Sequence, residues 1–123
     1  MVVFDSNIFI YAGSDKLKRA LIDDADACYA SITKIEVLGY HKITVGQARA
    51  LARILDSYQM ICLSDSIIQL AIALRQSKKL GLGDAVVAAT AIDQGCDLWT
   101  ANSQDFKDIP DLTVDNPFKA DNQ

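Results

Sequence analysis

The chain has 123 residues, of which half are hydrophobic and 23% are charged. This length suits one domain with its own core, and this composition excludes a disordered chain. The formal net charge of −4 excludes a uniformly basic surface for nucleic acid. Any contact with nucleic acid therefore needs a local basic patch, or a metal ion that reverses the charge of an acidic pocket.

The cysteine content limits the kinds of site that the chain can build. Cys28, Cys62 and Cys96 are widely spaced, form no C-x-x-C pair, and are accompanied by a single histidine. This pattern argues against a zinc site. Their apolar surroundings predict buried free thiols in a reducing compartment. The sequence shows no leader and no bilayer-spanning run, so we expect a soluble, cytoplasmic protein with no membrane contact.

The first quarter of the chain predicts two strands separated by helix. Val2–Phe4 is a short apolar run, typical of a parallel strand covered on both faces. Ser6 can cap a short helix that runs through residues 8–11, although this stretch is also compatible with a strand. One or two turns of helix are expected over 16–23. Residues 28–32 then form the second predicted strand.

The middle of the chain contains two helix-start signals and a strand. Thr33 with Glu36 three residues later predicts a capping box at the start of a helix. Thr44 can cap the next helix, whose apolar residues recur at helical spacing. Met60–Leu63 reads as a buried strand.

The second half predicts two more helices. Asp65 or Ser66 caps a long helix, and Asp84 opens an alanine-rich helix that ends near Gly95. The remaining strands are expected at 97–100 and 112–114.

Strands that alternate with helices predict an α/β fold. We expect a single three-layer domain over residues 1–117, with helices on both faces of a central, mostly parallel sheet. Residues 118–123 are expected to form a polar tail. In such sheets, functional sites lie beyond the carboxyl ends of the strands.

Four acidic residues fall where a predicted strand ends or a helix begins: Asp5, Glu36, Asp84 and Asp105. Glu36 is also the only glutamate in the chain. Taken singly, Glu36 and Asp84 are better explained as helix caps, and Asp105 is equally well explained as a turn residue. Independent caps have no reason to converge, however. If the fold gathers these carboxylates, they form a site for a hard divalent metal ion.

Four stretches of the sequence carry a family resemblance. They are residues 3–11, 31–39, 82–91 and 98–106. In this order, the chain resembles the PIN domain, and more narrowly the VapC-type toxin nucleases of bacterial and archaeal toxin–antitoxin pairs. Each stretch alone is a weak signal, but the four together cover nearly the whole chain and are fairly specific.

The resemblance implies an Mg²⁺- or Mn²⁺-dependent endoribonuclease. It implies Asp5, Asp84 and Glu36 as metal ligands. Asp105 would act through water or as a general base, which makes these four the expected catalytic residues. The side chains of Ser6, Thr100 and Asn102 would orient carboxylates and waters around them. Many relatives carry aspartate where Asn102 stands, so a second metal ion would be held more weakly here.

The resemblance also implies partners. We expect an RNA substrate, a cognate antitoxin that covers the active-site groove, and a homodimer with contributions from helices within residues 44–75. Arg49, Arg53, Lys78 and Lys79 are usually a solvated face, but could line an RNA groove. One alternative is a PIN fold that binds RNA or protein without cleavage. An aspartyl-phosphate phosphatase is a second alternative, but it usually has an aspartate where Asn7 stands.

Overall fold

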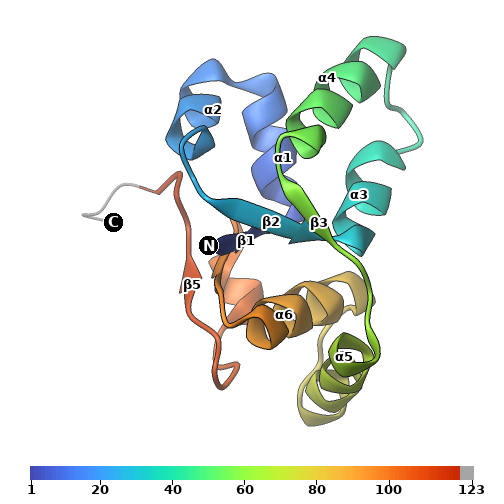
Figure 1. Ribbon diagram of the computed structural model, residues 1–123, viewed down its shortest axis with the longest axis vertical. Helices are drawn as coiled ribbons and strands as arrows, with labels where there is room; N and C mark the ends of the chain where they lie inside the picture. The colour runs from blue at the N-terminus through green and yellow to red at the C-terminus, as the bar shows by residue number, and fades with distance from the viewer. Residues whose placement is uncertain (120–123) are drawn as a thin grey trace.

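A five-stranded parallel sheet lies at the centre of the molecule (Figure 1). The computed structural model describes residues 1–119. The strands are β1 (Val2–Phe4), β2 (Ala27–Ala30), β3 (Gln59–Ile61), β4 (Asp97–Trp99) and β5 (Val114–Asp115), in the spatial order β3-β2-β1-β4-β5. All strand pairs are parallel, so every strand ends at the same edge of the sheet. We call this the carboxyl edge and the opposite one the amino edge.

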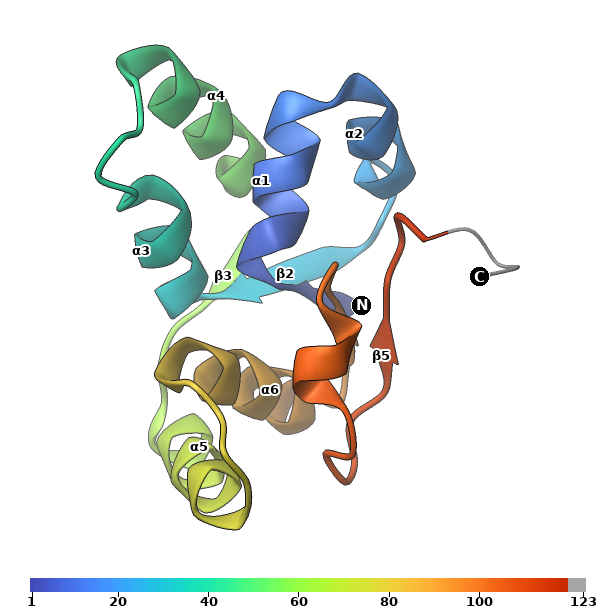
Figure 2. The same cartoon turned by 180° about the vertical axis from the view of Figure 1, so that it is seen from behind.

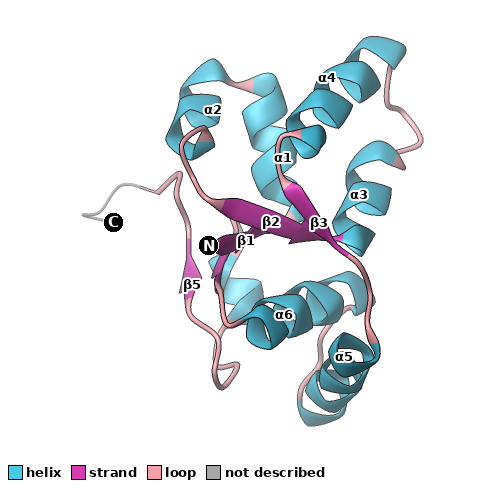
Figure 3. Cartoon of the chain, in the orientation of Figure 1, coloured by secondary structure: helices cyan, strands magenta, loops and turns pink. Residues whose placement is uncertain are grey.

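Helices cover both faces of the sheet (Figures 1 and 2). One face carries α1 (Ser6–Ser14), α2 (Lys16–Ile22), α3 (Ser31–Leu38) and α4 (Val45–Asp56). The other carries α5 (Asp65–Ser77) and α6 (Leu82–Gln94), and a short 3₁₀ helix, η1 (Ser103–Phe106), follows β4. Figure 3 shows the three layers by type of element. The predicted α/β fold is confirmed.

The strand period of two divides the core into two apolar clusters. Val3, Cys28 and Leu98 pack on the face covered by α6, and Phe4 and Tyr29 pack on the face covered by α1 and α4. Helix α6 lies between α5 and the sheet, and its residues from 85 to 91 are all buried. Its small alanines allow this close approach on several sides.

Two predicted helix boundaries are confirmed by their hydrogen bonds. Thr44 caps α4: its hydroxyl accepts from the Gln47 amide, and the Gln47 side chain accepts from the Thr44 amide. At the end of α6, Gly95 adopts a φ of 64°, a left-handed conformation that glycine adopts without strain.

The predicted capping box at Thr33 and Glu36 is wrong. Helix α3 begins at Ser31, directly after β2, with Ala30 at the cap position. The predicted strand over 28–32 therefore ends at Ala30, and Thr33 lies inside the helix with a buried hydroxyl. The Glu36 side chain is free for another role because it does not fold back on the helix start.

Three other predicted caps lie one to three residues away from the true ones. Asp5, not Ser6, is the N-cap of α1, and its carboxylate accepts from the Ser6 amide. Ser64, not Asp65 or Ser66, caps α5. Helix α6 begins at Leu82, which places Asp84 in its first turn. Neighbouring Asp and Ser residues are equivalent as cap formers, so their sequence alone does not choose between them.

The strand predicted at Met60–Leu63 is not buried. It forms as β3 over Gln59–Ile61 at the edge of the sheet, where the Met60 side chain is 39% exposed. Cys62 beyond it is exposed and Cys96 is half-buried, so only Cys28 matches the predicted buried thiols. Burial raises the pKa of the Cys28 thiol to about 11.

The end of the described chain packs onto the domain. The Phe118 ring contacts Tyr11 edge to face, with ring centroids 6.1 Å apart, and the Lys18 ammonium lies over both rings. Residues 120–123 of the expected tail lie outside the described residues. Within residues 1–119, no helix combines the length and the apolar character that a bilayer crossing requires.

Candidate functional site

Asp5 lies at the carboxyl end of β1 and is only 4% exposed. Its Oδ1 accepts from the Ser6 amide at 2.7 Å, and its Oδ2 accepts from the Thr100 hydroxyl at 2.9 Å. Burial raises the pKa of Asp5, while the hydrogen bonds from Ser6 and Thr100 partly offset this effect. The central strand therefore presents a buried carboxylate in a fixed orientation.

Asn7 connects Asp5 to the loop after β4. Its amide nitrogen lies 3.4 Å from Asp5 Oδ2, and its Oδ1 accepts from the Ala101 amide at 2.9 Å. Thr100 also accepts, at 3.0 Å, from the amide of Asn102. Sequence reasoning missed Asn7 as a site residue. Its position two residues after a strand-ending aspartate was the available signal.

Glu36 and Asp84 come from opposite faces of the sheet, on α3 and α6. The Glu36 carboxylate lies against Gly83: a Cβ added to Gly83 would come within 2.6 Å of Glu36 Oε2. Burial of the carboxyl group raises the pKa of Glu36, and the charges of Asp5 and Asp84 raise it further. The missing side chain of Gly83 thus leaves the space that Glu36 occupies beside Asp84.

Asp84 is half-buried in the first turn of α6. Burial is the main cause that raises the pKa of Asp84, and the charges of Asp5 and Asp105 raise it further. Asp105 itself is exposed on η1, with its amide donating to the Asn102 carbonyl at 3.0 Å. The fold therefore brings Asp5 and Asp84 within electrostatic reach of each other, and Glu36 and Asp105 each within reach of both. We call these four residues the acidic site.

Asn102 supports the acidic site through its backbone. Its amide donates to Thr100 and its carbonyl accepts from Asp105, while the residue as a whole is exposed. Ser6 likewise orients Asp5 through its amide, and this hydrogen bond lowers the pKa of Asp5. The loop from Thr100 to Asp105 is thus joined to the carboxylate of Asp5 through the Thr100 hydroxyl.

No ion pair within residues 1–119 involves the acidic site. The two that occur there, between Met1 and Asp26 and between Arg19 and Asp23, lie at the amino edge. Three acidic side chains are nowhere close enough in this part of the chain to form a ready-made metal chelate. Mg²⁺, however, commonly uses one or two direct carboxylates and keeps several waters. The oxygen-only donors of Asp5 and Asp84 fit a metal ion bound in this way.

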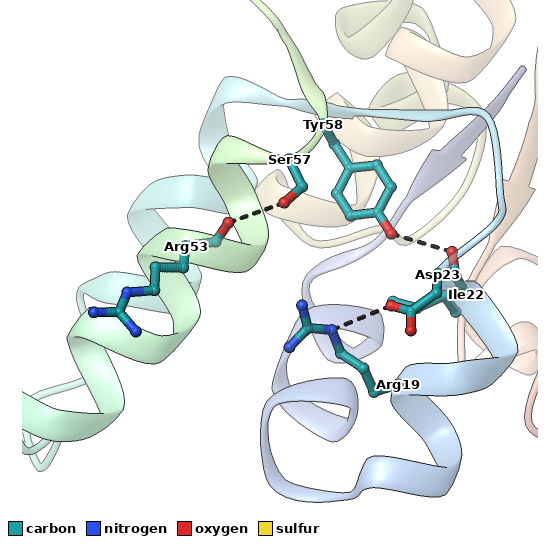
Figure 4. Close-up of polar contacts among 6 residues, drawn as sticks. All are labelled: Arg19, Ile22, Asp23, Arg53, Ser57 and Tyr58. Carbon is teal, nitrogen blue, oxygen red and sulfur yellow. Dashed lines mark hydrogen bonds and ion pairs between the residues drawn. The ribbon is translucent and has the colours of Figure 1, made fainter.

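The four predicted RNA-contacting residues lie in two different places. Lys78 and Lys79 lie in the connection between α5 and α6, which leads to Asp84. Arg53 lies in the last turn of α4, and its carbonyl accepts from Ser57 near the amino edge (Figure 4). Arg49 is one turn earlier on the same helix. The structure does not bring these two pairs together.

The sequence matches one protein family over most of its length. The family model of the PIN domain matches residues 2–112, a range that contains the whole acidic site. The chain belongs to the PIN domain family. Within that family it resembles the VapC-type toxins. No curated protein matches the chain in a sequence comparison.

Solved structures that resemble this chain include chains of toxin–antitoxin and VapBC complexes. A chain of a toxin–antitoxin complex from Klebsiella pneumoniae is 31% identical, with a TM-score of 0.81 over 98% of this chain and 100% of that one. VapBC2 from Rickettsia felis, bound to a promoter DNA fragment, is 23% identical, with a TM-score of 0.79 over 94% and 98% of the two chains. VapBC-1 from nontypeable Haemophilus influenzae is 20% identical, with a TM-score of 0.78 over 97% and 100%. The last two similarities establish the PIN fold alone.

Proposed function

We propose that this PIN-domain protein is a metal-dependent endoribonuclease of the VapC type, acting as the toxin of a toxin–antitoxin pair in the cytoplasm. The observation that carries the proposal is the acidic site. It gathers four carboxylates at the carboxyl edge without a compensating cation from residues 1–119. A fold gains no stability from such an arrangement unless a bound cation offsets the repulsion.

The residues of the acidic site divide the expected chemistry among them. Mg²⁺ or Mn²⁺ held by Asp5 and Asp84 would supply charge screening at the phosphate, a more acidic water and an aligned attack. Ser6, Asn7 and Thr100 hold the Asp5 carboxylate in place through the hydrogen bonds described above. The carboxylates of Glu36 and Asp105 would orient the attacking water and accept its proton.

Cleavage of a mixed pool of structured RNA tests this function. The purified protein is compared in Mg²⁺, in Mn²⁺ and in chelator, beside an Asp5→Asn variant prepared identically. We expect cleavage that requires the metal ion and is lost in the variant. Asparagine is as good an N-cap as aspartate, so the variant keeps the start of α1. Full activity of a folded Asp5→Asn protein would contradict the assignment.

A module that binds RNA without cleaving it is the second candidate. Two observations favour it: no three acidic side chains within residues 1–119 converge on a metal position, and Asn102 brings no charge to the site. This candidate predicts RNA retention with no cleavage in either metal. Restoring aspartate at position 102 would then be the first change to test for gain of cleavage.

An apolar groove supports the proposed antitoxin partner. It has a volume of about 460 Å³ and lies between α1, α3 and α4. Its lining includes Ile10, Val37, Tyr40, Ala50 and Leu51. Ile10 is 45% exposed and Tyr40 is 54% exposed. An amphipathic helix of an antitoxin fits such a surface, because its apolar side would cover these side chains.

A charge placed in the groove tests this partner surface. Ala50→Glu should prevent stable binding of a co-expressed antitoxin while leaving RNA cleavage unchanged, since Ala50 lies on α4 outside the acidic site. Ala20→Glu on the exposed surface of α2 makes the same chemical change away from the groove and should leave both properties intact. Equal antitoxin binding by both variants would exclude the groove as its docking site.

Exposed apolar residues also support the proposed homodimer. Ile68 and Ile72 lie four residues apart on one face of α5 and are 38% and 46% exposed. Leu63, between the edge strand β3 and α5, is 51% exposed. This surface lies within the region that the sequence suggested. Light scattering should give the mass of a dimer for the parent chain and of a monomer for Ile72→Lys.

A further inference from the structure

Three lysines border the acidic site where two loops meet. Lys78 and Lys79 occupy the α5–α6 connection, and Lys107 follows η1. The Lys78 ammonium donates to the Lys107 carbonyl at 2.5 Å, which ties the two loops together. Figure 2 shows the α5–α6 connection and η1 passing on the same side of α6. We call Lys78, Lys79 and Lys107 the basic rim.

The basic rim lies close along the chain to two carboxylates of the acidic site, Asp84 and Asp105. Lys107 is two residues after Asp105 and its amide closes η1 on the Gln104 carbonyl. Lys79 precedes Asp84 by five residues, and η1 packs against α6. A polyanion whose reacting phosphate lies over the acidic site would therefore place its neighbouring phosphates close to these ammonium groups.

None of the three ammonium groups of the basic rim forms an ion pair with a carboxylate in the described part of the chain. Neither of the two ion pairs within residues 1–119 involves these lysines. Lys79 and Lys107 are exposed, and Lys78 uses only one of its three N–H groups for the bond to Lys107. At the amino edge, by contrast, Arg19 is paired with Asp23.

The overall charge makes a local cationic surface necessary for RNA binding. With a net charge of −4, the protein as a whole repels RNA, and the carboxylates of the acidic site add to that repulsion. Lysine is a compact point charge that neutralises phosphate without reading the bases. The rim provides such charges where the repulsion must be overcome.

We propose that the basic rim binds the RNA backbone phosphates next to the scissile one, so that the RNA crosses η1 and the α5–α6 connection. This rests on the proposed ribonuclease function, because that function places the scissile phosphate at the acidic site. It assigns no such role to Arg49 and Arg53, whose helix ends at the amino edge.

The experiment measures binding of a fluorescent single-stranded RNA by anisotropy over a range of salt concentrations. Chelator is present, so that binding is read without cleavage. The test variant carries Lys79→Gln and Lys107→Gln, which leaves the Lys78 side chain and its bond to the Lys107 backbone intact. The control carries Arg49→Gln and Arg53→Gln, an identical change in net charge.

We expect the rim variant to reduce the slope of log affinity against log salt by about 1.4, because each phosphate of a single strand that a lysine neutralises contributes about 0.7. Its affinity should fall about 5-fold per lysine at 0.1 M salt, while the control keeps the parent's slope. Equal reductions in both variants, or no measurable RNA binding by the parent, would overturn the proposal. Loss of antitoxin binding with unchanged RNA binding would also overturn it and would make the rim a protein interface.

Failure of the ribonuclease proposal gives a different result. A folded protein that never cleaves RNA but shows rim-dependent binding would support RNA binding by the basic rim and exclude the ribonuclease function. If cleavage requires Asp5 but RNA affinity is the same in the rim variant and the parent, the ribonuclease function is supported and RNA binding by the basic rim is excluded.

Discussion

Both edges of the sheet carry carboxylates, but within residues 1–119 two of them at the amino edge are paired with cations, and those of the acidic site at the carboxyl edge are not. At the amino edge, Asp23 pairs with Arg19 at 3.3 Å, and Asp26 lies 3.8 Å from the terminal amine of Met1 (Figure 4 shows the first pair). The Asp23 and Asp26 side chains are 54% and 87% exposed. At the carboxyl edge, the carboxylates of the acidic site are without a cationic partner in residues 1–119, and Asp5 is buried.

This difference separates an ordinary surface from a candidate site. Exposed, paired carboxylates cost little and stabilise the fold by roughly 0–1 kcal/mol per pair. Carboxylates that lose contact with water and repel one another destabilise the folded state until a cation binds. Burial, the larger cause, and repulsion together raise the pKa of Asp5, Glu36 and Asp84. The comparison predicts that equivalent substitutions at the two edges have different, and in one case opposite, effects.

The largest difference concerns RNA cleavage. Asp5→Asn should reduce the cleavage rate by more than about 100-fold, because even loss of a residue that only orients a metal ligand costs about 10- to 100-fold. Asp23→Asn at the amino edge should leave the rate unchanged. Single-turnover cleavage of one RNA by both proteins measures this. Similar rates for the two variants would remove the functional distinction between the edges.

Metal binding should distinguish the edges in a stability measurement. Mn²⁺ at about 100 times its dissociation constant should stabilise the parent by about 2.7 kcal/mol. Asp84→Asn should abolish this gain, because it removes a proposed direct ligand. Asp26→Asn should preserve it. Thermal unfolding with and without Mn²⁺ gives the result, and an unchanged gain in Asp84→Asn would exclude that ligand.

The hydrogen bond from Thr100 to Asp5 should have a smaller effect on cleavage. Thr100→Val preserves side-chain shape but removes the donor to Asp5 Oδ2, and should reduce cleavage by about 10- to 100-fold. Thr90→Val is the matched control, since Thr90 is also buried but bonds the Val86 carbonyl within α6. Thr90→Val should cleave like the parent. Equal losses would assign the effect to packing rather than to orientation of Asp5.

The smallest effect is a change in the stability of the metal-free protein. Glu36→Gln should raise the free energy of unfolding at pH 7 by a few tenths of a kcal/mol up to about 1 kcal/mol, because it removes a charge that burial of the carboxyl group and repulsion from Asp5 and Asp84 disfavour in the folded state. Asp23→Asn should lower it by up to about 0.5 kcal/mol, through loss of the pair with Arg19. Urea unfolding in chelator measures both changes, and the same sign for the two would contradict the comparison.

The stabilisation by Glu36→Gln should depend on pH in a defined direction. Because the folded-state pKa of Glu36 is raised above 4.5, the folded state holds its proton more tightly than the unfolded chain does. The stability associated with the protonated group is present below pH 4.5 and is lost as pH rises through the folded pKa. The difference between Glu36→Gln and the parent should thus be small near pH 4 and grow toward neutrality.

Sequence signals that depend on near neighbours in the chain predicted the fold well. The apolar run Val2–Phe4, the Thr44 cap and the stop at Gly95 depend on a few adjacent residues, and the structure contains each of them. The capping box at Thr33 failed because the same short pattern also fits a residue already inside a helix. The strand predicted at Met60–Leu63 forms as β3, but its predicted burial was wrong, because burial depends on the position of a strand in the sheet and β3 is an edge strand.

The sequence by itself determined the α/β alternation, the PIN resemblance and the identity of the acidic residues, because these follow from residue order and type. Only the tertiary structure decided that Asn7 and Thr100 hold Asp5, that Gly83 leaves space for Glu36, and that Arg53 lies at the end of α4 that leads to the amino edge. The physical reason is that these relations join residues distant in sequence through the packing of whole elements. Parallel pairing aligns all strand ends at one edge, and the helix positions then determine which side chains reach it.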